Sequence, residues 1–146
     1  MASGLSAGDV APQLRMAVVR LARRLRQLDE AAEGITVSRL SALAVVAKHG
    51  PLTLGALAEA ERVQPPTMTR IAARLEEAGL LQRTMQPGDR RVTLVEATER
   101  GRRLLVESRS RRTAYLTERL RMVAPSDLIA LDRAATLIQE MLEGEE

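Results

Sequence analysis

Hydrophobic residues recur at steps of three and four between residues 10 and 32, and this period predicts a long amphipathic helix. Its stripe contains Val10, Leu14, Val18, Leu21, Leu25 and Leu28. Gly34 is expected to end this helix. Thr36 then stands where its side chain can cap a second helix, which runs to His49 and stops at Gly50-Pro51.

The middle of the chain contains shorter elements. Thr53 is placed to cap a short third helix over the segment "LGALAEA". A fourth helix is expected to begin at Pro65-Pro66, because proline is tolerated in a first turn, and to end near Gly79. The segments "LLQRTM" and "RVTLVEA" alternate like strands on either side of a loop that contains Gly88. They predict a small β-hairpin.

Two helices are predicted after the hairpin. Thr98 is expected to cap a fifth helix that runs to about Val123. Ala124-Pro125 should break it, and Ser126 is expected to cap a sixth helix. The sixth helix carries an apolar stripe of Leu128, Leu131, Ala135, Ile138 and Met141 or Leu142. The predicted fold class is therefore mostly α with a small β-hairpin.

The long helices at the two ends of the chain have too little partner surface within one copy. Their stripes have to be buried somewhere, and helices of a second subunit are the simplest solution. The alternative is that the first, fifth and sixth helices bury one another within a single chain.

Arginine carries nearly all of the positive charge. The formal net charge is only +3, and Lys48 is the only lysine. A planar guanidinium suits phosphate groups and guanine edges, although arginine-rich codon usage in a GC-rich genome explains the same bias. Tyr115 is the only aromatic residue. Because single-stranded nucleic acid is usually held by stacking on aromatic rings, double-stranded DNA is the better candidate partner.

Several functional classes lack the residues that they need. The chain has no cysteine and one histidine, His49, which removes thiolate metal sites, multi-histidine metal sites and redox-sensing thiols. No glycine-rich phosphate loop is present, so we expect no enzyme, no cofactor and no metal. The first residues do not form a signal peptide, and the longest apolar run, 42–47, is too short for a bilayer. A cytoplasmic protein without membrane contact is expected.

The fourth predicted helix has one apolar and one polar face at 3.6 residues per turn. Met68, Ile71, Ala72, Leu75 and Ala78 are expected to face the core. The outward face holds Pro66, Thr69, Arg70, Ala73, Arg74 and Glu77, with Thr67 at its flank. Its N-terminal amides and helix dipole favour phosphate, and Arg70 and Arg74 can reach guanine edges. A helix that enters the major groove tip first explains this face, and a solvated surface is the plainer alternative.

The loop "PGDRR" supports the DNA interpretation. Gly88 permits an unusual turn, and Arg90 and Arg91 project from it, where they can lie along a minor groove. A short helix, a turn, a second helix and a β-hairpin together form the winged helix-turn-helix arrangement.

The segments "LGALAEAERVQPPTMTRIAARLEEAGLLQR" at 54–83 and "GDRRVTLVEATERG" at 88–101 resemble the MarR family of bacterial transcriptional regulators. The resemblance covers nearly the whole chain. It implies a winged helix-turn-helix region at 35–98 and a helical dimerisation region at 1–34 and 99–146. It also implies a sequence-specific, ligand-responsive repressor that binds an inverted-repeat operator as a homodimer. The alternative is an architectural DNA-binding protein with little sequence preference, which the arginine-rich segment "RSRR" at 109–112 could serve.

The resemblance also implies roles for individual residues. Thr67, Thr69, Arg70 and Arg74 match the recognition helix, and Gln64 lies near its start. The wing residues are Asp89, Arg90 and Arg91, of which Arg91 matches the arginine that enters the minor groove and Asp89 the acid that supports it. Family members often release DNA when a small anionic or phenolic effector binds between the two regions. Arg15, Arg23 and His49 lie in the matching part of this chain.

Overall fold

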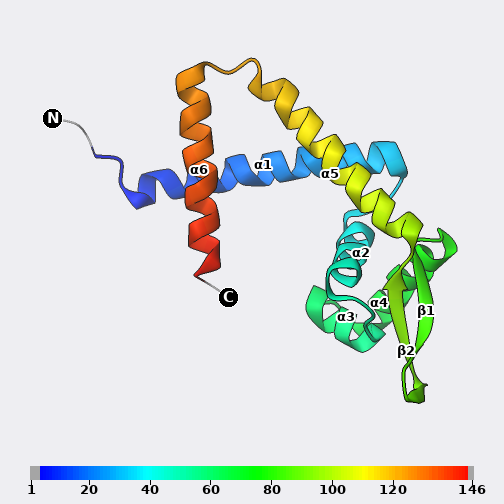
Figure 1. Ribbon diagram of the computed structural model, residues 1–146. Helices are drawn as coiled ribbons and strands as arrows, with labels where there is room; N and C mark the ends of the chain where they lie inside the picture. The colour runs from blue at the N-terminus through cyan, green and yellow to red at the C-terminus, as the bar shows by residue number, and fades with distance from the viewer. Residues whose placement is uncertain (1–3, 145–146) are drawn as a thin grey trace. The chain divides into compact units, whose positions relative to one another are not determined.

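A computed structural model describes residues 4–144, which contain six helices and one two-stranded hairpin (Figure 1). In chain order the elements are α1 (Ala7–Glu33), α2 (Val37–His49), α3 (Leu54–Glu61), α4 (Pro65–Glu77), β1 (Leu81–Gln86), β2 (Asp89–Ala97), α5 (Glu99–Leu120) and α6 (Pro125–Glu143). The chain divides into two compact units, one that ends at Arg111 and one that begins at Arg112. The predicted fold class and element order are confirmed.

The first three helices begin at polar caps. Thr36 and Thr53 accept hydrogen bonds from the amides of Arg39 and Ala56, as predicted. The first helix begins at Ala7, ahead of the predicted residue 10, because Ser6 and Asp9 form a reciprocal capping box. Hydrogen bonds from the side chain and backbone of Ser6 hold the pKa of Asp9 below its usual value. Gly34 ends the helix in the left-handed conformation at φ 63°.

The predicted start of the last helix is wrong in one detail. Ala124 is the capping residue of α6, without a side-chain hydrogen bond, and Pro125 is the first helical residue. Ser126 therefore lies inside the first turn and does not cap it. Proline can begin the helix because its fixed φ suits the first turn. An amide N–H at that position would have no partner within the helix, so its absence costs nothing. Likewise α5 ends at Leu120, short of the predicted Val123, and amide bonds to Arg119 and Leu120 close a tight turn at 121–123.

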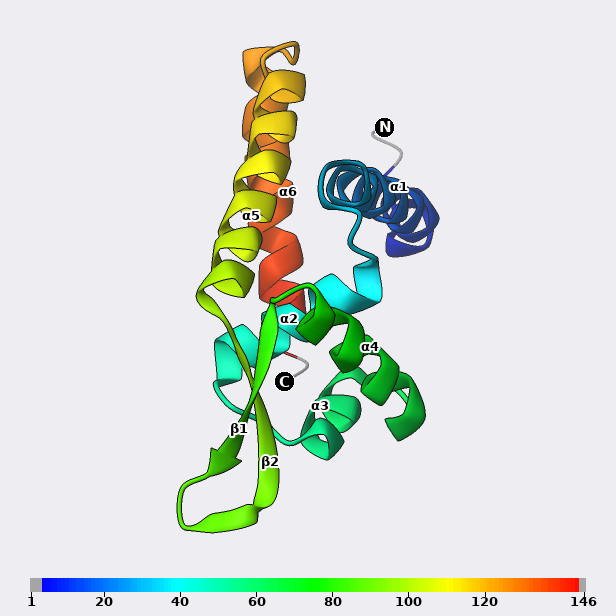
Figure 2. The same ribbon diagram turned by 90° about the vertical axis from the view of Figure 1, so that its right-hand side faces the viewer.

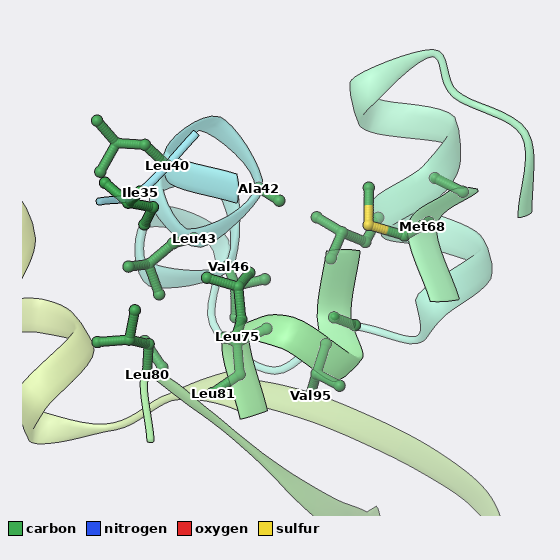
Figure 3. Close-up of a cluster of buried hydrophobic side chains, with 14 residues drawn as sticks. Ile35, Leu40, Ala42, Leu43, Val46, Met68, Leu75, Leu80, Leu81 and Val95 are labelled. Carbon is green, nitrogen blue, oxygen red and sulfur yellow. The ribbon is translucent and has the colours of Figure 1, made fainter. Parts of the chain in front are cut away.

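The buried core lies in the first unit, between α2, α3, α4 and the hairpin. Figure 3 shows part of this cluster, in which Leu43, Leu57, Met68, Leu75 and Val95 are almost completely buried. The predicted inward positions of α4 are confirmed except for Ala78, which is exposed. The helix ends at Glu77, so Ala78 is its C-cap and leaves the helical period. Leu80 and Leu81 continue the core in its place.

The hairpin pairs in an antiparallel register from Leu81 opposite Ala97 to Met85 opposite Thr93. A third segment adds one more pair of hydrogen bonds. The amide of Leu52 donates to the Val95 carbonyl at 3.0 Å, and the Val95 amide donates back at 2.7 Å. The turn after α2 is thereby fixed to the inner strand of the hairpin. The sequence did not predict this bridge.

A tight junction joins the base of the hairpin to α5. Thr98 caps α5, as predicted, because its hydroxyl accepts from the amide of Gly101 at 3.0 Å. The same hydroxyl donates to the Gly79 carbonyl at 2.6 Å. At Gly101 the Leu80 carbonyl oxygen approaches so closely that an added Cβ would lie 2.3 Å from it. Glycine is thus required at this position for close packing rather than for its backbone angle.

A charged cluster joins α1 to α5 in the same unit. The Arg111 guanidinium donates to Asp29 at 2.8 Å and to Glu33 at 2.9 Å. Asp29 is only 2% exposed, and it is the one buried residue of α1 in the part of the chain that the structure describes. This cluster was not predicted from the sequence.

The second unit contains the end of α5 and all of α6. The Arg119 guanidinium lies 5.3 Å from the centre of the Tyr115 ring, on the next turn of the same helix. None of the α6 residues within 125–143 is buried in the single chain. The apolar stripe of α6 is consequently exposed, except for the half-buried Ile138.

Candidate nucleic-acid interface

Helix α4 presents the predicted polar face to solvent. Thr69, Arg70, Ala73 and Arg74 are exposed and Thr67 is half-buried, while Met68, Ala72 and Leu75 hold the opposite face in the core. The helix is fixed to α3 by a sharp turn at Arg62, which adopts the left-handed conformation at φ 54°. Two amide bonds to the end of α3, from Arg62 to Glu59 and from Val63 to Ala58, close this turn. The turn sets the direction in which α4 leaves the core.

The expectation that free amides at the start of α4 attract phosphate is wrong. Pro65 and Pro66 occupy the first two helical positions and have no N–H group. The next amide, that of Thr67, already donates to the Gln64 carbonyl at 3.0 Å. Gln64 is the exposed N-cap and makes no side-chain capping bond. The start of α4 therefore offers fewer N–H groups to a phosphate than an ordinary helix start, and the exposed side chains carry more of the contact.

The hydroxyl of Thr69 is committed within the helix. It donates to the Pro65 carbonyl, one turn earlier, at 3.0 Å. Its oxygen can still accept a hydrogen bond, and its methyl group remains available for an apolar contact such as a thymine methyl. Thr69 is therefore suited to base contact as an acceptor or an apolar group.

The two arginines of the outward face differ. Arg70 forms no ion pair with any residue that the structure describes, and its side chain is exposed. Arg74 pairs with Glu77, three residues further along the helix, at 3.3 Å. Both side chains of the pair are about two-thirds exposed, at 64% and 67%. A pair of this kind is worth only about 0.2–1 kcal/mol, so another anion can compete for Arg74.

The hairpin tip, residues 87–91, projects beyond helices α2–α4 in both views (Figure 2). Gly88 adopts the left-handed conformation at φ 86°, as its predicted turn requires. The Asp89 carboxylate accepts from the backbone amide of Arg91 at 3.0 Å. Asp89 therefore fixes the backbone at Arg91 and not its guanidinium. Arg90 and Arg91 are exposed and make no ion pair within residues 4–144.

The eight predicted site residues thus form two groups within the first unit. Five belong to α4 and its N-cap, and three belong to the hairpin tip. A link between the two elements comes from residues that the sequence analysis did not select: Arg83 of β1 pairs with Glu76 of α4 at 2.9 Å. Their sequence signal, an acid and a base separated by seven residues across a predicted turn, is too common to identify the pair.

Neither a metal-binding cluster nor a membrane-spanning helix accompanies these groups in the part of the chain that the structure describes. Within residues 4–144, no three His, Cys, Asp or Glu side chains are grouped so that they could hold a metal ion. No helix in that range has both the length and the apolar character needed to cross a membrane. What the first unit does offer is a two-helix turn with a positively charged outward face and a hairpin with an arginine tip. These features define a winged helix-turn-helix DNA-binding protein.

Comparisons with known proteins agree with this class. Residues 35–93 match the model of the MarR family. The chain is 40% identical to the uncharacterised HTH-type transcriptional regulator ML2140 of Mycobacterium leprae, over 92% of this chain and 93% of that protein. It is 29% identical to the HTH-type transcriptional repressor MdtR of Bacillus subtilis, over 78% and 74% of the two chains. The structure is similar to that of RV1404 from Mycobacterium tuberculosis, with a TM-score of 0.81, 28% identity and coverage of 96% and 97%.

The chain belongs to the MarR family of transcriptional regulators. It is a DNA-binding regulator of transcription and not an enzyme.

Proposed function

We propose that the protein is a cytoplasmic homodimeric repressor that binds an inverted-repeat operator and responds to a small anionic or phenolic effector. Residues 35–98 bind DNA, and residues 1–34 and 99–146 hold the dimer together. The recognition-helix contacts come from Gln64, Thr67, Thr69, Arg70 and Arg74, and the wing contacts from Asp89, Arg90 and Arg91. The relative MdtR is named as a repressor, which supports this direction of control.

The observation that carries the proposal is the outward face of α4. Arg70 is exposed and without an ion pair in the part of the chain that the structure describes, and the neighbouring Ala73 leaves room for close approach. A guanidinium in this position can form a bidentate contact with a guanine edge in the major groove. The architectural alternative is less well supported, because Arg111 of the "RSRR" segment is occupied by Asp29 and Glu33.

We expect a dimer in solution. Apolar side chains of the two terminal helices are open to solvent in the single chain, for example Val18 at 47%, Leu131 at 48% and Met141 at 59% exposure. Burying such stripes against a second copy removes this apolar area from water. Sedimentation at micromolar concentration should give the mass of two chains. A helical, monomeric species under the same conditions contradicts the prediction.

Alanine substitutions at Arg70 and Arg91 should affect DNA binding in different ways. Arg70→Ala should cost about 1–3 kcal/mol on the operator and relax the preference at one position in each half-site. Arg91→Ala should weaken binding to many sequences, lessen the preference for A·T-rich flanks and lower the salt slope by about one per subunit. Competition binding against base-substituted duplexes at several salt concentrations measures both effects.

The control for these variants is Arg109→Ala, on the exposed surface of α5. In a specific regulator it should leave operator affinity unchanged. If Arg109→Ala weakens binding as much as Arg70→Ala, and no duplex outcompetes random DNA, the protein is architectural.

A two-fold dimer should also protect two half-sites whose centres lie about 10–10.5 base pairs apart.

Asp89→Ala and Asp89→Asn should differ from each other. Both variants remove a negative charge near DNA, but an asparagine oxygen can still accept from the Arg91 amide, whereas alanine cannot. Asp89→Ala should therefore bind DNA about tenfold more weakly than Asp89→Asn, a difference of about 1.4 kcal/mol for the lost hydrogen bond and the looser tip. Titration of each variant with the operator measures the ratio. Equal affinities would mean that this bond does not position Arg91.

A further inference from the structure

The base of the hairpin is fixed to the end of α4 by backbone bonds. Gly79 adopts the left-handed conformation at φ 72°, and the Leu80 amide donates to the Leu75 carbonyl at 2.9 Å. The Thr98 amide, just after β2, donates to the Leu80 carbonyl at 3.1 Å. These bonds hold the first residues of β1 and the last residues of β2 in place. They do not fix the direction of the hairpin tip, which lies several residues further along both strands.

One residue pair marks the level at which the hairpin leaves the helices. Arg83 of β1 lies opposite Val95 of β2 in the antiparallel register. On the β2 side, Val95 exchanges two backbone hydrogen bonds with Leu52, at 2.7 and 3.0 Å. On the β1 side, Arg83 pairs with Glu76 of α4. Beyond this level, residues 84–94 form no hydrogen bond or ion pair with a helix in the part of the chain that the structure describes.

Arg83 lies on the face of the hairpin that continues the core. Residues two apart along a strand share a face, as do residues paired across two strands. Leu81 and Val95, which share the face of Arg83, are buried at 3% and 1% exposure. Met85, the next residue of β1 on this face, is 60% exposed. The contact with Glu76 therefore lies where the core ends and the projecting part of the hairpin begins.

The Glu76 carboxylate is largely enclosed. Its side chain is 28% exposed, and its Oε1 atom is buried. The Arg83 Nε–H group donates to Oε2 at 3.2 Å, while Oε1 lies 2.9 Å from Nε without accepting a hydrogen bond from any described residue. Arg83 is thus the only counter-charge of this acid within residues 4–144. Partial exclusion of water strengthens such a pair relative to an exposed one.

We propose that Glu76 and Arg83 form a brace that sets the direction of the hairpin tip relative to α4. With the bridge to Leu52 alone, the hairpin is held along β2 and can turn about it. The brace adds an attachment on β1 at the same level and restricts this turning. Both are positioning residues and do not contact DNA. The inference rests on the proposed function, since the brace presents Arg91 to the minor groove while α4 lies in the major groove.

A braced tip contributes more to DNA binding than a freely turning one. Arg91 on a free tip would lose motion when it binds, and this ordering cost would offset part of its contact with DNA. In the braced protein the tip is already restrained. Removing the brace should therefore reduce the contribution of Arg91 and leave that of Arg70 unchanged.

Distances between two spin labels test the brace in the DNA-free protein. The chain has no cysteine, so Pro87→Cys on the tip and Ala73→Cys on α4 supply the only thiols, and both positions are exposed. Dilution with unlabelled chains restricts the measurement to distances within one chain. Glu76→Ala and Arg83→Ala should broaden the distance distribution equally. The double variant should broaden it no further, because both changes remove one contact.

Glu96→Ala is the matched control for Glu76→Ala. It removes the same charge and a contact of the hairpin, the hydrogen bond that Glu96 accepts from Gln82 at 2.7 Å on the face opposite Arg83. The distance distribution should keep its width in this variant. Equal widths in Glu76→Ala and Glu96→Ala overturn the brace. Circular dichroism of Glu76→Ala should match the unmodified protein, because alanine is a good helix former.

Operator binding of the unmodified protein, Glu76→Ala, Arg91→Ala and the double variant tests the link to DNA. Arg91→Ala should weaken binding by a factor about threefold larger in the unmodified protein than in Glu76→Ala, which lies within the range for residues coupled in one network. The preference for A·T-rich flanks should fall in Glu76→Ala, while the base preference assigned to Arg70 stays. A general loss of stability would not separate these two preferences.

The possible failures are distinguishable. If Arg91→Ala has the same effect with and without Glu76, the brace is overturned and the wing contact of the proposed function stands. If Arg91→Ala has no effect in the unmodified protein, the wing contact is wrong and the presentation of Arg91 is overturned with it. If Arg83→Ala lowers the salt slope of DNA binding and Glu76→Ala does not, Arg83 itself contacts a phosphate and the proposal is overturned.

Discussion

Gly101→Ala is expected to destabilise the protein by more than about 3 kcal/mol, a large share of the stability of a small domain. The new methyl carbon would lie 2.3 Å from the Leu80 carbonyl oxygen and 3.1 Å from a methyl group of Leu43. The first neighbour is backbone and cannot move without breaking the bond that Leu80 accepts from Thr98. The loss should therefore be larger than for ordinary overpacking. Urea unfolding at a fixed protein concentration measures it.

Gly55→Ala is the matched control. Gly55 is also helical, but it is exposed, and an added methyl carbon would be 3.9 Å from its nearest neighbour, the Thr53 hydroxyl. Alanine is the better helix former, so stability should stay the same or rise by up to about 1 kcal/mol. If the two variants unfold at the same urea concentration, the close approach at Gly101 is not rigid.

Asp29→Ala is expected to cost about 3 kcal/mol of unfolding free energy. Removing one member of a buried ion pair usually costs about 3–5 kcal/mol, because the other charge stays behind without its partner. The loss of unfolding free energy should lie at the lower end of this range, because Arg111 is 26% exposed and keeps its contact with Glu33. Urea unfolding at the same protein concentration is the measurement.

Glu77→Ala gives the comparison for a surface pair. It breaks the exposed contact with Arg74 and should change stability by less than about 1 kcal/mol. A double variant, Asp29→Leu with Arg111→Leu, should recover much of the loss, because an apolar pair removes both charges from the interior. If Asp29→Ala lowers the free energy of unfolding by less than about 1 kcal/mol, burial of this pair does not contribute to stability as proposed.

Local signals in the sequence predicted much of the fold. Thr36, Thr53 and Thr98 were identified as caps because a side-chain oxygen before an apolar period is a short-range feature. Gly34 and Gly88 were identified as turn residues for a similar reason, since glycine tolerates the left-handed conformation. The helical period alone predicted which residues of α4 face the core and which face solvent, up to the residue where the helix ends.

Features that depend on distant parts of the chain could not be predicted in this way. The bridge between Leu52 and Val95 involves a single residue pair, so it leaves no alternating pattern. Asp29 and Arg111 are on different helices, and each is one charged residue among many. The hollow lined by Glu33, Arg39, Ala78 and Arg103 is assembled from the ends of four helices. The sequence alone did not decide whether Ser126 or the preceding proline marks the start of α6. Ser126 was assigned as the cap, whereas the helix begins at the proline.

The double proline at the start of α4 has a consequence for the thermodynamics of DNA binding. Each ring restricts the backbone angle φ to about −65°, so the leading turn has few alternative conformations in the free protein. Ordering a flexible backbone on binding costs roughly 1–2 kcal/mol per residue, and this cost is small where the chain is already restrained. The leading turn of α4 is thus preorganised. The sequence preference of this helix can change through exchange of its side chains, while the backbone that presents them stays the same.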